Sequence, residues 1–540
     1  MVKSDCECEL LVVGGGLGGC AAALAALEAG RRVVLTEPTD WIGGQVSQQG
    51  VPPDENRWIE SCGAARSYAR YRSLVRGYYR EHFPLTRSAF EDACLNPGGA
   101  WVSRIGHLPW VSVAVLQAML ARYVASGRLR LWHEVEPTGA EVDGDAVRAV
   151  TFRQVNGGEP FVVQAKFVID ASECGDLLPL AGCEYVTGFE SQSEHGEPHA
   201  PAAAQPTNMQ AVTWCFAMDC AAGDHVIDRP SDYDHWREYV PAVTPAWPGR
   251  MLSWVYSNPR TLEPCKGTVE AGERGGEAGV RLWEYRQVLD PRIFDPAMRT
   301  GLDEVADALH PGITIVNWPQ NDYIVGPVFE CKDAAHHMRQ AKRLSLSLFY
   351  WMQTEAPRSD GGVGYPNLRL RPDVMGTCDG FAKRPYIREA RRIRAQLTVT
   401  ENHVARHARG SDAEAARFDD SVGIGAYHLD LHPSTGGDNY IDMPSYPFQI
   451  PLRALVPVRL RNLLPAAKNI GTTHIANGCY RLHPVEWSIG EAAGQLAAMC
   501  VDEGVSPQAV AASAERVEAL QRALTARGVP LDWPAIRVPG

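Results

Sequence analysis

The sequence predicts an α/β fold: a parallel sheet with helices on both faces, and an α+β domain inserted into it. Three segments lead to this prediction. Residues 10–37 read as strand, glycine turn, helix and strand; residues 165–176 read as an apolar strand ending in small residues; residues 462–498 read as a strand and a later helix of small residues. A chain of 540 residues also exceeds what one hydrophobic core usually serves, so two connected domains are expected.

The first segment is a βαβ unit with a phosphate-binding turn. An apolar strand at residues 10–13 runs into the pattern GxGxxG, formed by Gly14, Gly16 and Gly19, and an alanine-rich helix follows. Gly14 permits the tight turn, Gly16 lets the backbone approach a pyrophosphate, and Gly19 lets the helix pack closely against the strand. The helix N-terminus offers unpaired N–H groups and the positive end of its dipole to the phosphates.

A second strand ends at Glu37, close to the spacing of about 20 residues expected for a ribose-binding acid. Its carboxylate can accept hydrogen bonds from both hydroxyls of an adenosine ribose and would repel a 2′-phosphate. Strand, turn, helix, strand and terminal acid occur in the expected order. Together they predict a Rossmann-type domain that binds a dinucleotide.

The segment after the acid favours FAD over NAD. Its sequence PTDWIGGQ, with Gly43, Gly44 and Gln45, resembles the glutathione-reductase-like FAD superfamily, in which an ExxxxxGG loop continues around the cofactor beyond its pyrophosphate. The strand that ends at Asp170 resembles the superfamily's DATG strand, although Ala171 is followed here by serine and glutamate. The resemblance implies that FAD is the cofactor.

Residues 462–498 resemble the closing motif of the same superfamily. A polar turn at Lys468 and Asn469 follows the strand, and Asn469 stands where the superfamily often has an acid that holds the ribityl chain. Pro484 suits the first position of the helix that follows. The N-terminus of that helix would favour negative charge on the flavin as it is reduced.

The positions expected to bind FAD lie in these motifs and in the neighbouring strands. They are Gly14, Gly16, Leu17, Gly18, Gly19, Glu37, Pro38, Gly43, Gly44, Gln45, Val135, Ala171, Asn469, Ile470 and Pro484. A second glycine turn, at residues 361–366, has no helix of small residues behind it and is interrupted by Pro366, so a built-in NAD(P)H domain is not expected. Electrons must therefore come from a small-molecule substrate and leave to oxygen or to an external acceptor.

Longer stretches resemble a bacterial family of FAD-dependent oxidoreductases. They are residues 46–60, 96–104, 317–323, 383–392 and 427–432. With the FAD motifs, they spread the resemblance over residues 10–500. The resemblance implies an FAD-dependent dehydrogenase or oxidase. The chain departs from the family after Arg104, where residues 106–109 replace a Glu-Pro pair.

The order of the motifs predicts a cofactor domain that is threaded in pieces. The predicted parts are a first FAD-binding part at 10–185 with a helical insertion near 57–93, a substrate domain at 186–420, a return segment of the FAD-binding domain at 421–505, and a C-terminal helix and tail at 506–540. Residues 191–206, rich in histidine, proline and glutamate, read as an exposed loop or lid of the substrate domain.

The catalytic candidates are residues that could take a proton while flavin accepts hydride at N5. Histidine suits a base near neutral pH, which singles out His432, with Asp430 beside it, and His483 at the start of the last motif's helix. A carboxylate beside an imidazole would fix its tautomer and raise its pKa. Arg104 could hold a carboxylate or the flavin's carbonyl edge. The alternatives are structural or surface roles for the histidines and a salt bridge for Arg104.

Net charge, hydropathy and cysteine content exclude several classes of function. A formal charge of -12 and a pI of about 5.8 argue against binding to nucleic acid or to anionic membranes. No apolar stretch is long enough for a membrane span and no signal peptide is evident, so a cytoplasmic location is expected. The 14 cysteines form no CxxC pair and no zinc-like Cys/His spacing, so no metal site is predicted. The oligomeric state is left open.

The leading hypothesis is an enzyme that oxidises a CH–OH or CH–NH group of a small polar metabolite by hydride transfer to FAD. One alternative is a flavin-dependent tailoring oxidase in a biosynthetic pathway, such as a desaturase or an amine or N–N oxidase. Another is a protein in which FAD has no net redox role. Reduction of the flavin by a substrate separates these hypotheses.

Overall fold

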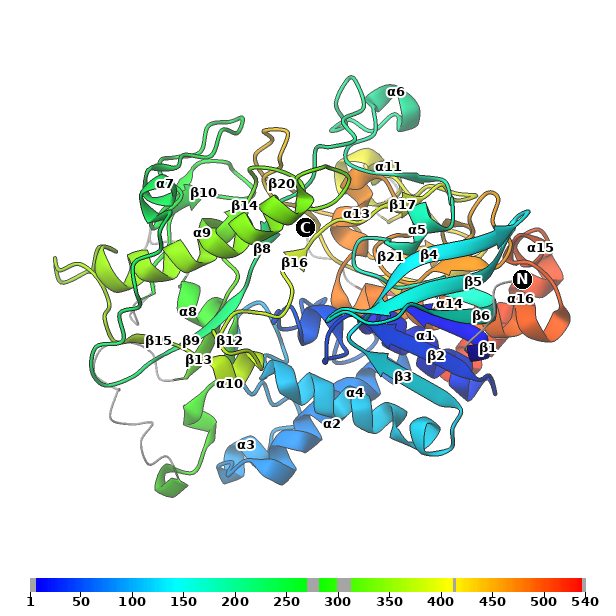
Figure 1. Ribbon diagram of the computed structural model, residues 1–540, viewed down its shortest axis with the longest axis horizontal. Coiled ribbons are helices and arrows are strands. Elements are labelled where there is room, and N and C mark those ends of the chain that lie inside the picture. Colours follow the sequence, from blue (N-terminus) through cyan, green and yellow to red (C-terminus); the bar gives the residue numbers. More distant parts are fainter. Residues whose placement is uncertain (1–5, 270–280, 299–311, 411–413, 537–540) are drawn as a thin grey trace.

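The computed structural model describes residues 6–269, 281–298, 312–410 and 414–536 (Figure 1). Its largest sheet has seven strands, in the order β3-β2-β1-β6-β5-β4, with β22 paired to β6 as well. The strands are β1 (Cys6–Val13), β2 (Val33–Glu37), β3 (Leu129–His133), β4 (Val135–Asp143), β5 (Ala146–Gln154), β6 (Phe161–Asp170) and β22 (Leu463–Pro465). Strands β1, β2, β3, β6 and β22 are parallel, which confirms the predicted α/β class.

The parallel strands of this sheet end along one edge. Val13 of β1 pairs with Asp170 of β6, and Pro465 of β22 pairs with the same aspartate from the other side. Thr36 of β2 is in register with Val13, so Glu37 ends β2 at the same edge. Because ligands of open α/β sheets bind outside the carboxyl ends of the strands, this edge is where a cofactor is expected.

Two helices of small residues cover one face of the sheet and cross at short range. They are α1 (Leu17–Glu28), which follows β1, and α14 (His483–Glu503), which lies downstream of β22. A Cβ atom at Gly490 would lie 2.1 Å from the carbonyl oxygen of Gly18. The glycines are therefore required for this crossing. Helix α4 (Pro109–Ala125) packs beside α1 and against β3.

The opposite face of the sheet is covered mainly by its own antiparallel arm, β4 and β5, and by the short helix α5 (Leu177–Leu180). A separate core lies there. Its members include Leu11, Val34, Val150, Phe152, Val168, Leu177 and Leu178.

A second region, rich in aromatic residues, holds another large core. Its sheets have the orders β12-β13-β9-β15 and β14-β8-β16, and α9 (Ala334–Thr354) packs against β8 and β14. The strands are β8 (Val212–Thr213), β9 (Phe216–Cys220), β12 (Gln287–Leu289), β13 (Ile313–Val316), β14 (Asp322–Tyr323), β15 (Leu368–Leu370) and β16 (Tyr386–Ile387). The domain boundaries proposed from the sequence stay a prediction.

Shorter elements complete the described chain. They are η1 (Gly44–Val46), α2 (Arg66–His82), α3 (Arg87–Glu91), β7 (Tyr185–Val186), α6 (Gln192–His195), α7 (Tyr233–Glu238), β10 (Val255–Ser257), β11 (Pro264–Lys266), α8 (Leu282–Tyr285), α10 (Pro372–Met375), β17 (Arg392–Ile393), α11 (Glu401–Val404), α12 (Arg406–Arg409), β18 (Ser421–Gly425), β19 (Leu429–Leu431), β20 (Ile441–Met443), β21 (Phe448–Pro451), α13 (His474–Tyr480) and α15 (Pro507–Ala511). The C-terminal helix α16 (Ala514–Arg527) buries Val517, Leu520 and Leu524. Within the described ranges, no helix combines the length and the apolar character that crossing a membrane requires.

Candidate functional site

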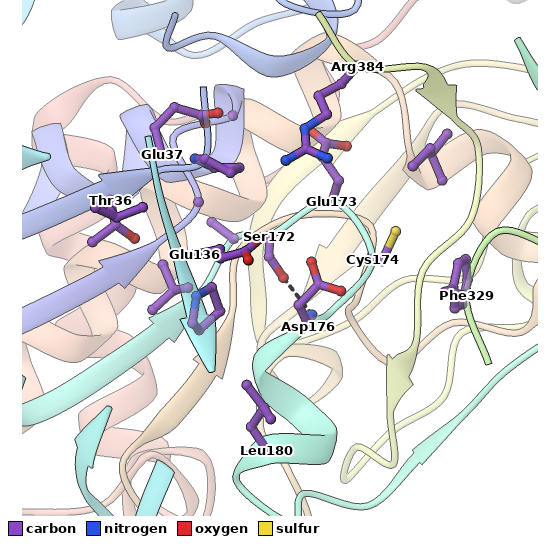
Figure 2. Close-up of a pocket in the computed structure, with 18 of the residues that line it drawn as sticks. Thr36, Glu37, Glu136, Ser172, Glu173, Cys174, Asp176, Leu180, Phe329 and Arg384 are labelled. Carbon is purple, nitrogen blue, oxygen red and sulfur yellow. Dashed lines mark hydrogen bonds between the residues drawn. The ribbon is translucent and has the colours of Figure 1, made fainter. Parts of the chain in front are cut away.

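A cavity of about 510 Å³ opens at the carboxyl ends of the parallel strands (Figure 2). This volume lies within the range of small-molecule and cofactor pockets. Figure 2 shows Thr36 and Glu37 on one side of the pocket and Phe329, from the second region, on the other. Of the predicted positions, those that line the cavity are Gly14, Gly16, Glu37, Pro38, Val135 and Ala171.

The glycine turn leaves no room for larger residues. Gly14 has φ +103°, and a Cβ atom there would lie 2.3 Å from the carbonyl oxygen of Ala171. A Cβ at Gly18 would lie 1.7 Å from the carbonyl oxygen of Ala466, and one at Gly19 would lie 1.9 Å from that of Gly14. The turn therefore brings the start of α1, which begins at Leu17, directly against the ends of β1, β6 and β22.

Glu37 is held at the end of β2 by three donors. Its Oε2 accepts from the N–H of Gly15 at 3.1 Å, and its Oε1 accepts from the N–H and the hydroxyl of Thr39, each at 2.9 Å. Burial raises the pKa of Glu37 to about 8, against these hydrogen bonds, which lower it. The carboxyl group is fixed beside the cavity, at the place predicted for a ribose-binding acid.

The N-termini of α1 and α14 converge on the carboxyl group of Glu486. Its Oε1 accepts a hydrogen bond of 3.0 Å from the N–H of Gly18, and Glu486 itself lies in the first turn of α14. Burial and then the nearby charge of Glu173 raise the pKa of Glu486 to about 7. Nζ of the buried Lys468 lies 2.5 Å from Oε2 of Glu173. Two helix N-termini and a buried ammonium make this an anion-binding position, which suits a pyrophosphate.

The loop after β2 carries buried polar atoms without partners. Gln45 donates from Nε2 to the carbonyl oxygen of Arg481 at 3.1 Å, but its Oε1 accepts nothing from the described residues. Oε1 of Gln48 and Oε1 of Gln49 likewise accept no hydrogen bond from the described residues, and Nε2 of Gln49 donates none to them. Because buried polar groups are normally hydrogen-bonded, these atoms indicate a polar ligand that extends from the glycine turn along this loop.

This donor set fits FAD. The glycine turn would hold the pyrophosphate, Glu37 the adenosine ribose, and the amides of Gln45, Gln48 and Gln49 the polar groups beyond the phosphates. Gly43 and Gly44, with φ of +115° and +56°, turn the loop back to the glycine turn, where the N–H of Gly43 donates to the carbonyl oxygen of Gly15 at 2.7 Å.

Asn469, which was predicted to hold the ribityl chain, bonds to the backbone of two neighbouring segments through its side-chain amide. Its Nδ2 donates to the carbonyl oxygen of Asp170 at 2.9 Å, and its Oδ1 accepts from the N–H of Ala467 at 3.1 Å. The amide therefore ties the turn after β22 to the end of β6. Ile470 beside it is fully buried, and Pro484 is the second residue of α14, which begins at His483.

His432 is hydrogen-bonded to the carboxylate of Asp322, a partner that the sequence did not predict. Its Nδ1 lies 2.5 Å from Oδ2 of Asp322, whose Oδ1 lies 3.2 Å from Nη2 of Arg388. Asp322 and Arg388 are almost fully buried, whereas the imidazole of His432 is 20% exposed. Of this pair, the imidazole of His432 is therefore the member that a substrate could reach.

Asp430, the predicted neighbour of His432, faces an arginine. Oδ2 of Asp430 lies 3.0 Å from Nη2 of Arg481 and 3.9 Å from Nε2 of His432. These five residues, His432, Asp322, Arg388, Asp430 and Arg481, form the charged cluster. Because Gln45 donates to the backbone of Arg481, the charged cluster lies beyond the loop that would hold FAD.

The electrostatics of the charged cluster keep His432 neutral. Burial alone would raise the pKa of Asp322, but Arg388 and His432 outweigh it and hold that pKa below its ordinary value. Burial, followed by Arg388, lowers the pKa of His432 and outweighs Asp322. As expected, the neighbouring carboxylates of Asp322 and Asp430 act to raise this pKa, but burial and Arg388 outweigh them and the net shift is downward. The carboxylate orients the ring, so that Nδ1 donates to Asp322 and Nε2 can accept a proton.

His483, the second predicted base, is a weaker candidate. It is fully buried, and its Nδ1 accepts from the N–H of Asp54 at 3.0 Å. Burial lowers the pKa of His483 to about 4. The neutral ring must then carry its proton on Nε2, which makes that atom a hydrogen-bond donor rather than a base.

Arg104 is not brought to the charged cluster. It is exposed in the loop before α4, and within the described ranges no residue of the charged cluster bonds to it. Its predicted role as a clamp is therefore unsupported by its position. The buried arginines of the charged cluster are instead Arg388 and Arg481, and a third buried arginine, Arg286, pairs with Asp54 at 3.1 Å. Two of the stretches with family resemblance, 317–323 and 383–392, contain Asp322 and Arg388 and could have indicated them.

Comparison with known families gives one extended match. A model of the family described as "FAD dependent oxidoreductase" matches residues 9–524, so the chain belongs to this family, and the match confirms the enzyme class and FAD as the cofactor. Among proteins with curated functions, none matches this chain.

Several solved structures resemble part of the chain. L-proline dehydrogenase from P. horikoshii is 14% identical, over 34% of this chain and 24% of that protein, with a TM-score of 0.18. The myxobacterial chondrochloren halogenase is 16% identical, over 41% and 46%, with a TM-score of 0.23. A flavoprotein/dehydrogenase from Cytophaga hutchinsonii is 17% identical, over 39% and 46%, with a TM-score of 0.23. The chain thus spans less than half the length of these proteins, and their substrates do not carry over to it.

Proposed function

Because the chain belongs to the family of FAD-dependent oxidoreductases, we propose that it oxidises a CH–OH or CH–NH group of a small polar metabolite, with His432 as the base. One observation supports this most strongly: an imidazole that is 20% exposed and whose Nδ1 faces a buried carboxylate at 2.5 Å.

The reaction divides between the cofactor and the chain. FAD, when bound, accepts the hydride that leaves the substrate carbon. Nε2 of His432 takes the proton of the substrate O–H or N–H group, so the substrate loses two electrons and two hydrogens in all. Asp322 keeps the imidazole in the required tautomer and stabilises the imidazolium that forms. The electrons then pass to oxygen or to an external acceptor.

The neighbouring arginines favour a polar but uncharged substrate. Arg286, Arg388 and Arg481 are each paired with an aspartate, so their charges are balanced. Each also has a buried Nε–H with no acceptor among the described residues. Donors of this kind can hold substrate oxygens without requiring a negative charge.

The test is anaerobic reduction of the FAD-loaded protein by separate pools of polyols, sugars and amines. Loss of the oxidised flavin's visible absorption with one pool, followed by its return when air or an artificial acceptor is added, is the expected result. The variant His432→Gln should bind FAD with an unchanged spectrum but reduce far more slowly.

Two other results would count against the proposal. A protein whose flavin no pool reduces, although dithionite reduces it, would favour a non-redox role. If substrate reduced the flavin of His432→Gln at the native rate, the protein would still be an oxidoreductase, but His432 would not be its base.

A further inference from the structure

A group of metal-ligating side chains lies away from the cavity, where the loop at residues 191–206 meets α11 and α12. Nδ1 of His199 lies 2.9 Å from Oε1 of Glu401, and Nε2 of His407 lies 3.1 Å from the same oxygen. One ligand atom from each of the three residues lies within 4.8 Å of the other two. In Figure 1 this place is near the top, where α6, in the same loop, stands above α11.

The carboxylate in this group is buried and incompletely satisfied. The side chain of Glu401 is 0% exposed, and its Oε2 accepts no hydrogen bond from the described residues. Leaving a buried carboxylate oxygen without a partner is costly. The imidazoles of His199 and His407 are 40% and 39% exposed, so an ion could reach the group from solvent.

We propose that His199, Glu401 and His407 bind one divalent transition-metal ion of the Zn²⁺ class. Two imidazoles and one carboxylate are an established ligand set for Zn²⁺, with a water molecule in the fourth position. Tetrahedral bonds of about 2.0–2.1 Å place ligand atoms ~3.3 Å apart. The two short distances of 2.9 and 3.1 Å are close to that edge length, and small rotations of exposed imidazoles would complete the geometry.

The surroundings hold the ligands in place. Oε1 of Glu197 accepts from the N–H of Glu401 and from the hydroxyl of Thr473, each at 2.6 Å. Nδ2 of Asn402 donates to the carbonyl oxygen of Gly196 at 3.1 Å. The loop is thus attached to α11 and to Thr473, the N-cap of α13. A bound ion would add a direct link from His199 to both short helices and fasten the loop.

This site departs from the prediction of no metal. That prediction rested on short Cys/His spacings, whereas His199 lies about two hundred positions before Glu401 and His407. Only the folded chain brings the three side chains together. The proposal concerns binding and does not depend on the oxidation chemistry of the cavity.

The test uses the full-length, untagged, FAD-loaded protein after dialysis against a chelator. Zn²⁺ is titrated calorimetrically, and Co²⁺ is added separately to record its visible ligand-field bands. One equivalent of Zn²⁺ should bind, and the thermal midpoint should rise with its concentration. His199→Gln and His407→Gln should each weaken binding more than about 100-fold, beyond the 10–100-fold typical of changes outside the ligand shell.

His195→Gln is the matched control, because it removes an imidazole from the same loop without removing a ligand. It should bind Zn²⁺ as the native protein does. An unchanged flavin spectrum in all variants shows that the fold is intact. The proposal fails if the native protein binds Zn²⁺ no better than His199→Gln and His407→Gln do, which would leave a hydrogen-bonded His–Glu–His group.

Discussion

The nucleotide end of the site, which comprises the glycine turn, Glu37 and the Gly43-Gly44 turn, differs from the charged cluster in how it is assembled. The glycine turn, Glu37 and the Gly43-Gly44 turn of the nucleotide end all lie within residues 14–45, one continuous βαβ unit and its loop. The charged cluster combines His432, Asp322, Arg388 and Arg481 from separate parts of the chain. The nucleotide end is thus built from one local segment that would position phosphates, whereas the charged cluster forms only when separate parts of the chain pack together. Substitutions should therefore affect stability and FAD affinity at the first, and rate at the second.

The largest effect is expected at Gly18, where the packing of α1 leaves no space for a Cβ atom. Gly18→Ala would place a Cβ atom 1.7 Å from the carbonyl oxygen of Ala466, so the turn and α14 would have to move apart. We expect a loss of more than about 4 kcal/mol in unfolding free energy, measured by urea denaturation. Gly30→Ala is the control: it has φ +92° but nothing within 4 Å of the added atom, and should cost about 1–2 kcal/mol. Equal losses would mean that the close contact at Gly18 relaxes at little cost, because Gly18 lies within α1 and, unlike Gly30, has no positive φ.

His432→Gln should affect chemistry and leave the nucleotide end intact. Without a base at Nε2, flavin reduction should slow by about 10²–10⁴-fold, while the FAD dissociation constant stays the same. Stopped-flow reduction and a flavin titration measure the two quantities. His428→Gln is matched to it, because His428 also pairs with a carboxylate, Asp442, at 2.6 Å on the same segment. A similar slowing in His428→Gln would point to a general disturbance of the segment instead of a specific base.

Glu37→Gln should weaken FAD binding without changing the rate of the loaded enzyme. Burial raises the pKa of Glu37 to about 8, so the test is made above that pH, where the substitution removes a charged acceptor, at about 1.5–3 kcal/mol, or roughly ten- to hundredfold in the dissociation constant. Glu136→Gln removes another cavity-lining carboxylate, one that is 32% exposed and paired with Arg153, and should have a smaller effect. If Glu136 proved the more important acid, the ribose would have to lie further along the cavity than β2 indicates.

The smallest expected effect concerns pH. The pKa of Glu486 is raised to about 7, so its carboxyl group is mostly neutral below that pH and charged above it. The charged form repels the pyrophosphate and competes for the N–H of Gly18, while the charges of Glu173 and Lys468 face the group and act on its pKa in opposite directions. The FAD dissociation constant should therefore rise, by less than about tenfold, as pH rises through about 7. In Glu486→Gln the change near pH 7 should disappear, while a separate change near the pKa of Glu37, about 8, remains; if the change near pH 7 persists, another group is titrating, such as Asp170, whose pKa burial raises to about 7.

The motifs of the sequence predict neighbours within one βαβ unit more fully than the contacts of the charged cluster. Gly14, Glu37 and the Gly43-Gly44 turn were recognisable because each acts within a few residues of its neighbours in space. Asp430 was placed beside His432 correctly, at 3.9 Å, but the shorter contact to Asp322 comes from 110 positions away in the sequence. The direction of the His432 pKa depends on its burial and on Arg388, neither of which a single segment reveals.

By itself, the sequence determined what local sterics and hydrogen bonding require: a glycine turn that admits a phosphate, an acid at the end of the second strand, and helices of small residues that can cross closely. The tertiary structure decided everything that depends on long-range packing. It used Asn469 to hold a turn, left Arg104 exposed, chose Asp322 as the partner of His432, and gathered His199 with Glu401 and His407. The physical reason is that burial and charge pairing are set by residues distant in the chain, which meet only after folding.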